Sequence, residues 1–362
     1  MISIQNLRKE FPGATPLVNI NAEIKKGEVI SIIGPSGTGK STLLRCINML
    51  EKPTSGKIFI DGEEITAKGC KIHLLRRKMG MVFQSFNLYP NMTVIENIMK
   101  GPVEILGRSR QDAYDRGMEI LDQVGLSSRS LRFPDELSGG QKQRAAIART
   151  LAMDPEIVLF DEPTSAFDPT MVGEVLAVIR NLAKQNLTMM IVTHEMKFAH
   201  DVSSRVFYMD EGIIYDEGTP EQIISHPQKE KTRRFIKQLK VFEEFIRSRD
   251  FDFMDIITRI EQFGRATMMD QKTIIGAQTV FEELCVQKML PCFGDNVDMR
   301  ITLEYSEKTG HAQMRVYYNG GFDYKASADD LSALLIKRVA FDTEYTHSSK
   351  ADYTDCIEIK LK

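Results

Sequence analysis

The 362-residue sequence has no tryptophan, few cysteines and no long apolar run. Its five cysteines are scattered and include no C-x-x-C pair, which argues against a disulfide scaffold or a zinc site and fits a reducing cytoplasm. No apolar stretch reaches the roughly 18 residues that a membrane-spanning helix needs, and the N-terminus has no secretory signal pattern. We therefore expect a protein without a transmembrane segment of its own, so that any membrane spans come from another chain.

Neither sign of charge dominates, because 47 Lys and Arg stand against 50 Asp and Glu. The net charge of -3 gives no indication of a nucleic-acid partner. Hydrophobic residues make up 42% and charged residues 27%, a balance that excludes wholesale disorder and a collagen-like chain. The length is sufficient for two domains.

The first part of the chain, to about residue 220, alternates short apolar runs with helical patterns. This alternation is typical of a parallel sheet covered by helices. The segments EVISIIG (28–34), IVLFDE (157–162) and LTMMIVTH (187–194) predict strands that are buried on both faces. Residues 56–65 alternate around an Asp-Gly pair, which predicts an antiparallel hairpin. Residues 93–133 have helical spacing and predict an inserted helical piece.

A change in composition near residues 225–250 predicts a domain boundary. We place the first domain at 1–240, and a linker helix with a C-terminal α+β domain at 241–362. The linker helix is predicted from apolar residues at spacings of four, three and four, namely Phe235, Leu239, Phe242 and Ile246. The remaining pattern predicts helices over 251–268 and 270–290, a hairpin of strands over 297–305 and 312–318, a helix over 329–342 and a last strand from 356 to 361.

The first chemical motif is Gly-Pro-Ser-Gly-Thr-Gly-Lys-Ser at residues 34–41, a complete GxxxxGKS between a predicted strand and a helical pattern. Glycines let consecutive backbone N–H groups close around phosphate oxygens, and the helix N-terminus adds partial positive charge. Lys40 is expected to reach the β- and γ-phosphates, and Ser41 to bind magnesium. The alternative is a plain glycine-rich turn. The predicted nucleotide-binding residues here are Gly34, Ser36, Gly37, Thr38, Gly39, Lys40, Ser41 and Thr42.

Two adjacent acids, Asp161 and Glu162, follow the predicted strand at 157–160. A strand tip of this kind can place Asp161 near the magnesium shell and Glu162 beside the γ-phosphate, as a general base or water-orienting carboxylate. Taken alone, the pair also fits a solvated turn. The phosphate-binding motif upstream favours the catalytic interpretation.

The third motif is LSGGQ at residues 137–141, directly before the helical pattern KQRAAIARTLA. Ser138 and Gln141 fit a capping box, and a capped helix start that includes Gly139 and Gly140 has N–H groups suited to hold a phosphate. With this motif the chain resembles the ATP-binding cassette (ABC) ATPases over residues 1 to about 240. The resemblance implies a P-loop NTPase fold of the α/β class, with a mixed sheet core, an antiparallel β subdomain and a helical subdomain.

The resemblance also assigns roles to residues that spacing alone does not single out. Gln84 resembles the Q-loop residue that senses magnesium and the attacking water, and His194 resembles the switch histidine that contacts the γ-phosphate. Phe11 stands where the family places an aromatic ring against adenine. Residues 165–168 resemble the D-loop and keep its Asp168, although a phenylalanine replaces the more usual leucine.

The mechanism implied by the resemblance is ATP hydrolysis, with Mg2+, in a head-to-tail homodimer that encloses two ATP molecules. ATP would stabilise the closed pair, and loss of phosphate would weaken it. Each site would combine the P-loop side of one copy with the signature helix of the other. The residues contributed are Lys40, Ser41, Gln84, Asp161, Glu162 and His194 from one copy, and Ser138, Gly139 and Gly140 from its partner.

Segments around these motifs are most similar to the ATPase subunits of bacterial polar amino-acid importers. That similarity implies a peripheral location at the cytoplasmic face of the cell membrane, integral permease subunits as partners and, indirectly, an extracellular solute-binding protein. Phe86, Leu88 and Tyr89 could line the permease docking cleft or simply pack locally. The alternative is a soluble ABC ATPase acting on DNA, ribosomes or assembly machinery, which the single cassette and the lack of a basic surplus disfavour.

Residues 251–362 exceed a minimal cassette and loosely resemble the histidine-kinase-type ATPase fold. The match lies in Glu282 and Glu283, in YYNGGFD (317–323) and in the segment before the last strand. Gln287 stands where that family has a magnesium-binding asparagine, and Asn319 falls near its adenine-binding aspartate. Three alternatives stay open: a degenerate fold for regulation or dimer contact, a different ligand-sensing domain, and retained nucleotide binding.

Overall fold

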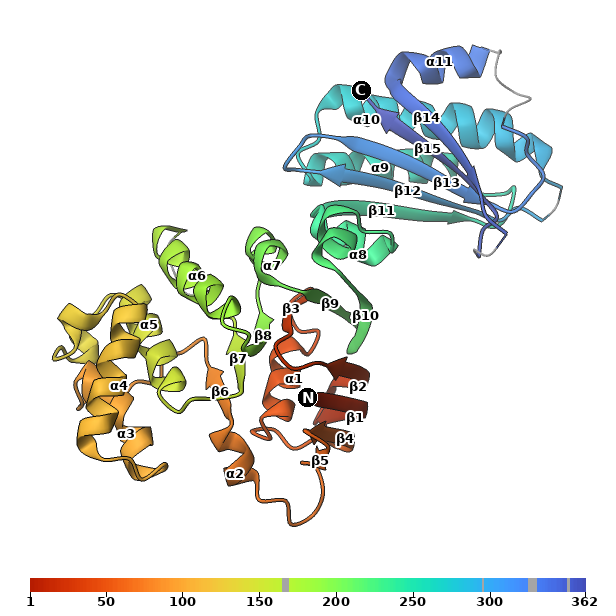
Figure 1. Cartoon of the computed structure of the whole chain (residues 1–362). Helices are drawn as coiled ribbons and strands as arrows, with labels where there is room; N and C mark the ends of the chain where they lie inside the picture. Colours follow the sequence, from red (N-terminus) through yellow and green to blue (C-terminus); the bar gives the residue numbers. More distant parts are fainter. Residues whose placement is uncertain (165–168, 295, 325–330, 350–351) are drawn as a thin grey trace. The chain divides into compact units, whose positions relative to one another are not determined.

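The computed structural model describes residues 1–164, 169–294, 296–324, 331–349 and 352–362. The chain forms two compact units, Met1–Arg233 and Arg234–Lys362 (Figure 1). The boundary lies within helix α8 (Glu230–Ile236), seven residues before position 240. In the described part of the chain, no helix combines the length and apolarity needed to cross a membrane.

The centre of the first unit is a six-stranded sheet in the order β10-β9-β3-β8-β7-β6. All neighbours pair in parallel except β10, which runs antiparallel to β9. Every residue of β3, β7 and β8 is buried, which confirms the prediction of strands covered on both faces. The strands are β3 (Val29–Ile33), β6 (Met79–Val82), β7 (Ile157–Asp161), β8 (Thr188–Val192), β9 (Arg205–Asp210) and β10 (Ile213–Gly218).

A second, antiparallel sheet of the first unit has the order β2-β1-β4-β5. Its predicted hairpin is confirmed, because Asp61 and Gly62 both have positive φ, 51° and 83°, as a two-residue turn between twisted strands requires. The strands are β1 (Ile2–Phe11), β2 (Ala14–Ile24), β4 (Ser55–Ile60) and β5 (Glu63–Glu64).

The predicted helical insertion is confirmed, since α3 and α4 pack with α5 as a separate helical group (Figure 1). Its apolar core includes Ile95, Ile98, Ile120 and Leu121, all buried. The helices and short helical turns of the first unit are α1 (Lys40–Ile47), α2 (Ile72–Arg77), α3 (Val94–Glu104), α4 (Arg110–Gln123), η1 (Ser127–Arg129), η2 (Pro134–Glu136), α5 (Gly139–Leu151), α6 (Pro169–Ala183), α7 (Met196–Val202), η3 (Glu221–Ser225) and the start of α8.

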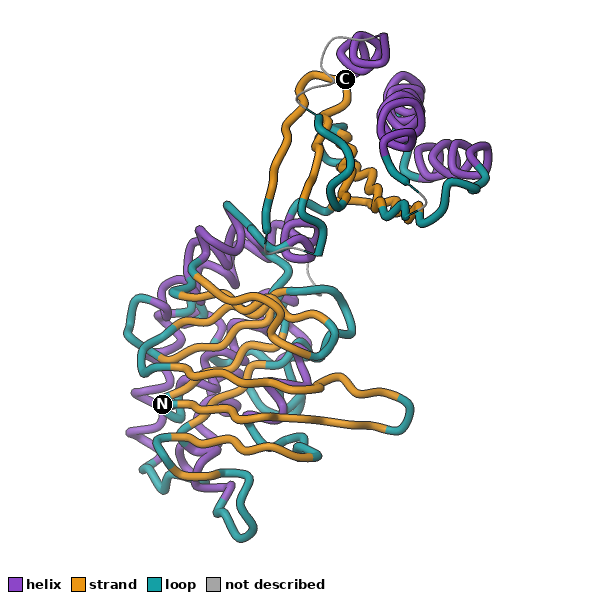
Figure 2. Tube along the Cα trace, turned by 90° about the vertical axis from the view of Figure 1, so that its right-hand side faces the viewer, coloured by secondary structure: helices purple, strands orange, loops and turns teal. Residues whose placement is uncertain are grey.

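The second unit is a five-stranded antiparallel sheet, ordered β11-β12-β13-β15-β14, with helices gathered against one face (Figure 2). The predicted helix pair and the predicted hairpin are confirmed. The elements are β11 (Leu239–Ile246), α9 (Phe253–Ala266), α10 (Gln271–Val280), η4 (Phe281–Met289), η5 (Leu290–Cys292), β12 (Met299–Ser306), β13 (Ala312–Tyr318), α11 (Leu331–Val339), β14 (Ala340–His347) and β15 (Asp355–Leu361).

Two predictions about the second unit are wrong. The linker helix ends at Ile236, and residues 239–246 form strand β11, which pairs with β12 along its whole length. Phe242 and Ile246 are buried and four residues apart, a spacing that both a helix face and an alternating strand satisfy. The helix predicted to reach residue 342 ends at Val339, because the chain turns there into edge strand β14.

Candidate active site

Four predicted site segments follow parallel strands and meet at one edge of the six-stranded sheet. The register pairs Val82 with Phe160, Asp161 with Val192, and Val192 in turn with Ile32. The strand ends that precede Gly34, Gln84, Glu162 and His194 are therefore neighbours. Ligands of open parallel sheets bind outside the carboxyl ends of the strands, at such an edge.

The loop between β3 and α1 has a backbone that glycine alone accommodates. Gly34, Gly37 and Gly39 have φ of 143°, 82° and 92°. A Cβ at Gly34 would lie 2.1 Å from the carbonyl oxygen of Met209, and a Cβ at Gly39 would lie 2.1 Å from that of Pro16. The loop is thus packed closely against neighbouring backbone, while Gly37 faces open space.

Lys40 is buried, and its side chain folds back over this loop. Its Nζ donates hydrogen bonds to the carbonyl oxygens of Gly34 at 2.9 Å and Pro35 at 2.7 Å. Burial lowers the pKa of Lys40, and the charges of Glu162 and Asp161 partly oppose this shift. The loop therefore holds a desolvated ammonium group, which would form a strong charge-assisted hydrogen bond with a phosphate oxygen.

Asp161 ends β7 with a buried carboxylate. Its Oδ2 accepts a hydrogen bond from Arg45 Nη2 at 3.4 Å, whereas its buried Oδ1 has no hydrogen-bond partner among the described residues. An unsatisfied carboxylate oxygen beside the hydroxyl-bearing loop fits a hard divalent cation, which prefers oxygen ligands. The hydroxyl oxygen of Ser41 and the amide oxygen of Gln84 are also oxygen ligands that suit such a cation. Gln84 is exposed and lies two residues after the end of β6.

Glu162 and His194 lie in direct contact. His194 Nε2 is 3.1 Å from Glu162 Oε1, so the pair joins the ends of β7 and β8. Glu162 has a φ of 47°, a left-handed conformation that is uncommon for a residue with a side chain and is found at functional sites. The backbone N–H of Glu162 donates a hydrogen bond to the carbonyl oxygen of Val192 at 3.2 Å. The contact places a histidine nitrogen beside the carboxylate expected to handle a proton.

The LSGGQ segment forms the predicted capping box at the start of α5. The backbone N–H of Gln141 donates to Ser138 Oγ at 3.3 Å, and the backbone N–H of Ser138 donates to Gln141 Oε1 at 3.0 Å. In the described part of the chain, no hydrogen bond or ion pair joins this helix start to the loop at residues 34–42. Within one copy, the structure therefore brings together the P-loop, Asp161, Glu162 and His194, while Ser138, Gly139, Gly140 and Gln141 lie in the helical group (Figure 1).

Two contacts near Gln84 were not predicted from the sequence, and both come from α5. Fully buried Gln143 donates through Nε2 to the carbonyl oxygen of Phe83 at 3.1 Å. Arg149 donates to the carbonyl oxygens of Asn87 at 2.6 Å and Phe86 at 3.3 Å. The helix that starts at LSGGQ thus holds the segment around Gln84. No sequence signal singles out these two side chains, because α5 also carries other polar residues such as Lys142 and Arg144.

Phe11, at the end of β1, is 40% exposed, and Lys9 Nζ lies 4.5 Å from its ring centroid. Its ring is accessible to a flat partner such as adenine. The predicted D-loop at 165–168, with Asp168, lies outside the described residues.

Comparisons with known proteins show the family of the chain. Residues 17–165 match the family described as ABC transporter. The chain is 47% identical over 243 residues to the L-cystine import ATP-binding protein TcyC of Bacillus subtilis (strain 168), covering 66% of this chain and 98% of that protein. It is 48% identical over 239 residues to the glutamine transport ATP-binding protein GlnQ of the same organism, covering 66% and 99%.

Solved structures give the same result for the fold. A dimeric post-hydrolysis state of an ATP-binding cassette bound to ADP and Pi is 34% identical, with a TM-score of 0.56, and covers 61% of this chain and 100% of that chain. A second cassette, cbiO1 from Clostridium perfringens, described as part of the ABC transporter complex cbiONQ, is 28% identical with a TM-score of 0.57 and covers 74% of this chain and 98% of that chain.

Proposed function

The chain belongs to the ABC transporter family and is an ATPase, and from this premise we propose that it drives an importer of polar amino acids. The observation that supports the ATPase activity is that buried Lys40, the unpaired Oδ1 of Asp161 and the Glu162–His194 contact lie at one sheet edge. Relatives named for cystine and glutamine transport support the substrate class, and they argue against the soluble non-transport alternative.

The catalytic step would be attack of water on the γ-phosphorus of ATP. The new bond forms between the water oxygen and phosphorus, the bond to the β,γ-bridging oxygen breaks, and Glu162 accepts the proton. His194 Nε2, 3.1 Å from Glu162 Oε1, would hold that carboxylate and reach the γ-phosphate. Lys40 would bind the β- and γ-phosphates, with the desolvated ammonium giving a strong charge-assisted contact.

Mg2+ would be held by Ser41, Gln84 and Asp161, whose hydroxyl, amide and carboxylate oxygens suit it. When bound, the ion would neutralise charge on the phosphate oxygens. Arg45 already orients the Oδ2 atom of Asp161, which leaves Oδ1 for another partner.

We also propose that two copies close head to tail over two ATP molecules. In each site, Ser138, Gly139 and Gly140 of the partner copy would cover the γ-phosphate. Ser138 is exposed at the capped start of α5, and the helix N-terminus there attracts anions. Asp168 is proposed as a further contact between the copies.

A permease would dock beside the segment after Gln84. A cavity of about 460 Å³ lies there, and it is lined by residues that include Asn87, Tyr89, Lys100 and Arg149. Tyr89 is the member of the predicted apolar trio that lines it, whereas Leu88 packs against the helical core. Because Arg149 binds this segment from α5, movement at the docking site would reach the signature helix. The solute-binding protein would act through the permease, from outside the cell.

For the second unit we propose a role in regulation or dimer contact, on a fold that resembles the histidine-kinase-type ATPases only loosely. Ser332 Oγ donates to Glu283 Oε2 at 2.5 Å, and Asn319 Oδ1 accepts from the backbone N–H of Thr354 at 2.8 Å. Both side chains that the resemblance would assign to nucleotide are thus engaged within the fold, which favours regulation over retained nucleotide binding.

The test is copurification with the permease in mild detergent at the cell membrane, followed by ATP hydrolysis in proteoliposomes with and without a polar amino acid and its binding protein. We expect transport-coupled stimulation of ATP turnover. Recovery of the chain with ribosomes instead, and no association with any integral membrane protein, would overturn the proposal in favour of the soluble alternative.

A further inference from the structure

Helix α8 (Glu230–Ile236) is anchored to the first unit by a buried polar contact. Thr232 is fully buried, and its Oγ1 donates a hydrogen bond to Oδ2 of Asp216 on β10 at 2.8 Å. The other oxygen of this carboxylate, Oδ1, lies 3.2 Å from Nζ of Lys229, the residue just before the helix. Because Asp216 is itself buried, the loss of either partner would leave its charge less well satisfied. The first turn of α8 is therefore held firmly on β10.

The same turn of α8 also contacts the hairpin bend between β9 and β10. Lys231 Nζ lies 2.7 Å from Glu211 Oε1 and 3.2 Å from Asp210 Oδ2. Asp210 ends β9, and Glu211 and Gly212 form the bend, with φ of 48° and 74°. The helix is thus bonded to both strands of this hairpin, so a movement of α8 would move the hairpin with it.

This hairpin supports both ends of the phosphate-binding loop. At the start of the loop, the carbonyl oxygen of Met209 lies 2.1 Å from the position that a Cβ on Gly34 would take. At its end, the carbonyl oxygen of Pro16 lies equally close to the corresponding position on Gly39, and 3.0 Å from the corresponding position on Gly212 of the bend. Closely packed backbone has little free volume in which to adjust. A shift of the hairpin would therefore be felt at both ends of the loop.

Two residues beyond Thr232, the same helix is bonded into the second unit. Arg234 forms an ion pair with Glu304 on β12, with 3.5 Å between Nε and Oε1. The carboxylate of Glu304 is fully buried and also accepts a hydrogen bond from Arg315 Nη1 at 2.8 Å. A helix of seven residues has little stability by itself in water, so α8 depends on its contacts at both ends. Release of the helix from one unit would weaken its contacts with the other.

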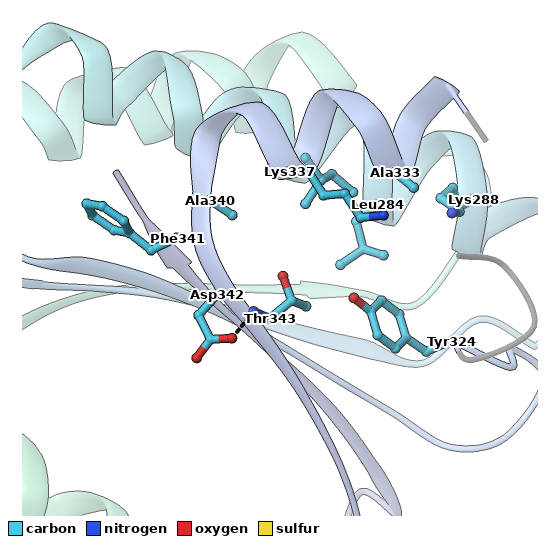
Figure 3. A pocket seen from close by; sticks show the side chains of 10 residues that line it. Leu284, Lys288, Tyr324, Ala333, Lys337, Ala340, Phe341, Asp342 and Thr343 are labelled. Atoms are coloured by element: carbon cyan, nitrogen blue, oxygen red, sulfur yellow. Dashed lines mark hydrogen bonds between the residues drawn. The ribbon is translucent and has the colours of Figure 1, made fainter. Parts of the chain in front are cut away.

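The ion pair between Arg234 and Glu304 lies outside the apolar core of the second unit. Helices η4 and α11 cover one face of the sheet, and Figure 3 shows Leu284 of η4 on that side, facing the strands. Leu303 belongs to the same apolar core as Leu284, and successive residues of a strand point to opposite faces. Glu304 therefore lies on the opposite face, and a substitution of Arg234 leaves the packing of the core intact.

We propose that α8 relays the state of the second unit to the phosphate-binding loop, with Thr232 and Asp216 as positioning residues. While α8 is anchored at both ends, the hairpin and the loop keep the conformation that binds ATP. When the second unit releases Arg234, the helix loosens and the affinity for ATP falls. The second unit would thus control nucleotide binding rather than the chemical step. This relay rests on the proposed regulatory role of the second unit, and it requires neither the permease nor the transported solute.

The first test is binding of ATP to the purified full chain, measured by isothermal titration calorimetry with EDTA present to prevent hydrolysis. Thr232→Val removes the hydroxyl but keeps the shape, and we expect it to raise the Kd about five- to tenfold. ATP turnover at saturating nucleotide should change by less than about twofold. Thr232→Ser, which keeps a hydroxyl, should bind ATP as the unmodified chain does, and so should Thr258→Val, the same substitution at an exposed position of α9.

Three results would overturn the positioning role of Thr232. The first is an unchanged Kd in Thr232→Val, and the second is an equal rise in the control Thr258→Val. The third is a fall in turnover at saturating ATP as large as the rise in Kd, because a general structural defect would affect both. The permease is absent from the assay, so a failure of the proposed transport function would not alter its outcome.

The second test asks whether the effect depends on the second unit. Arg234→Met should raise the Kd for ATP about threefold or more, whereas Arg300→Met, which breaks an ion pair with Glu243 on the same sheet, should leave it unchanged. The double variant of Thr232→Val and Arg234→Met should bind no more weakly than the weaker single variant, because both act through α8. Unchanged affinity in Arg234→Met, effects that multiply in the double variant, or an equal loss in Arg300→Met would contradict the relay.

Discussion

Gln143 on α5 donates from Nε2 to the carbonyl oxygen of Phe83, 3.1 Å away and one residue before Gln84. The glutamine is fully buried, and its own Oε1 has no hydrogen-bond partner among the described residues. A buried amide that leaves one end unsatisfied costs stability. The Nε2 end of the Gln143 side chain is therefore the end that forms a contact, and it joins α5 to the segment around Gln84.

We expect Gln143→Leu to lower ATP turnover about tenfold while changing the free energy of unfolding by about 1 kcal/mol or less. The leucine removes the unsatisfied Oε1, which offsets the hydrogen bond lost at Phe83. The Q-loop segment would nevertheless be held less firmly to α5. ATPase assays and urea denaturation measure the two effects. Gln111→Leu, on the exposed side of α4, is the matched control, and equal turnover in both variants would contradict a positioning role.

Glu162→Gln should still bind ATP but hydrolyse it about 10²- to 10⁴-fold more slowly, because the amide cannot accept the proton of the attacking water. A nucleotide-trapped dimer should then accumulate, measurable by size-exclusion chromatography with light scattering. Glu156→Gln changes the same residue type just before the opposite end of β7 and should keep normal turnover. Normal hydrolysis by Glu162→Gln would remove this carboxylate from the proton-accepting role.

Lys40→Met should abolish the stabilisation of the fold by ATP. For the unmodified chain, ligand at 100 times its Kd adds about 2.7 kcal/mol to the free energy of unfolding. Thermal denaturation with and without ATP measures the difference, and exposed Lys57→Met serves as control. Because burial lowers the pKa of Lys40, the free folded chain releases this proton below the pH at which the unfolded chain does. Its contribution to stability without nucleotide should therefore rise with pH in the alkaline range.

Asp355→Asn should destabilise the second unit in a pH-dependent way. Burial alone would raise the pKa of Asp355, but hydrogen bonds from Thr354, Tyr345 and His347 outweigh it and bring the pKa to about 2. The folded pKa lies below the ordinary value of 3.8, so the carboxylate stabilises the fold above about pH 4, and this contribution disappears as the pH falls to 2.

The expected difference in unfolding free energy between the unmodified chain and Asp355→Asn is on the order of 1 to 2 kcal/mol at pH 6. It should shrink between pH 4 and pH 2, as measured by denaturant titrations at several pH values. Asp352→Asn, next to the same turn, is the comparison variant. A difference that stays constant down to pH 2 would show that ionisation of Asp355 does not contribute.

The nucleotide side of the site was predictable because each of its motifs is local. GxxxxGKS needs its own glycines for positive φ. Asp161 ends a strand that its apolar run identifies, and Glu162 and His194 follow such strands. Parallel pairing then brings these strand ends together without further information. The contact between Gln143 and Phe83 joins residues 60 apart, and it depends on how α5 packs beside β6.

Strands β11 and β14 were missed for a different reason. Both are edge strands, so only part of each is covered, and their alternation is incomplete. In β11 the spacing of the buried residues Phe242 and Ile246 also fits a helix. The segment is a strand because its eight residues pair with β12. In β14 the charges of Asp342 and Glu344 point to solvent, and Lys360 of β15 pairs with both.

Only residues 237 and 238 separate the end of α8 from the start of β11. A gene that is divided to express the two units separately can therefore be cut only within this two-residue segment without shortening α8 or β11. A cut at 240 would remove the first residue of β11, the strand that pairs with β12. A cut further along the chain would expose the edge of β12, and fragments could then aggregate by adding a strand to that edge. Reporter insertions and tag fusions between the halves belong at 237–238.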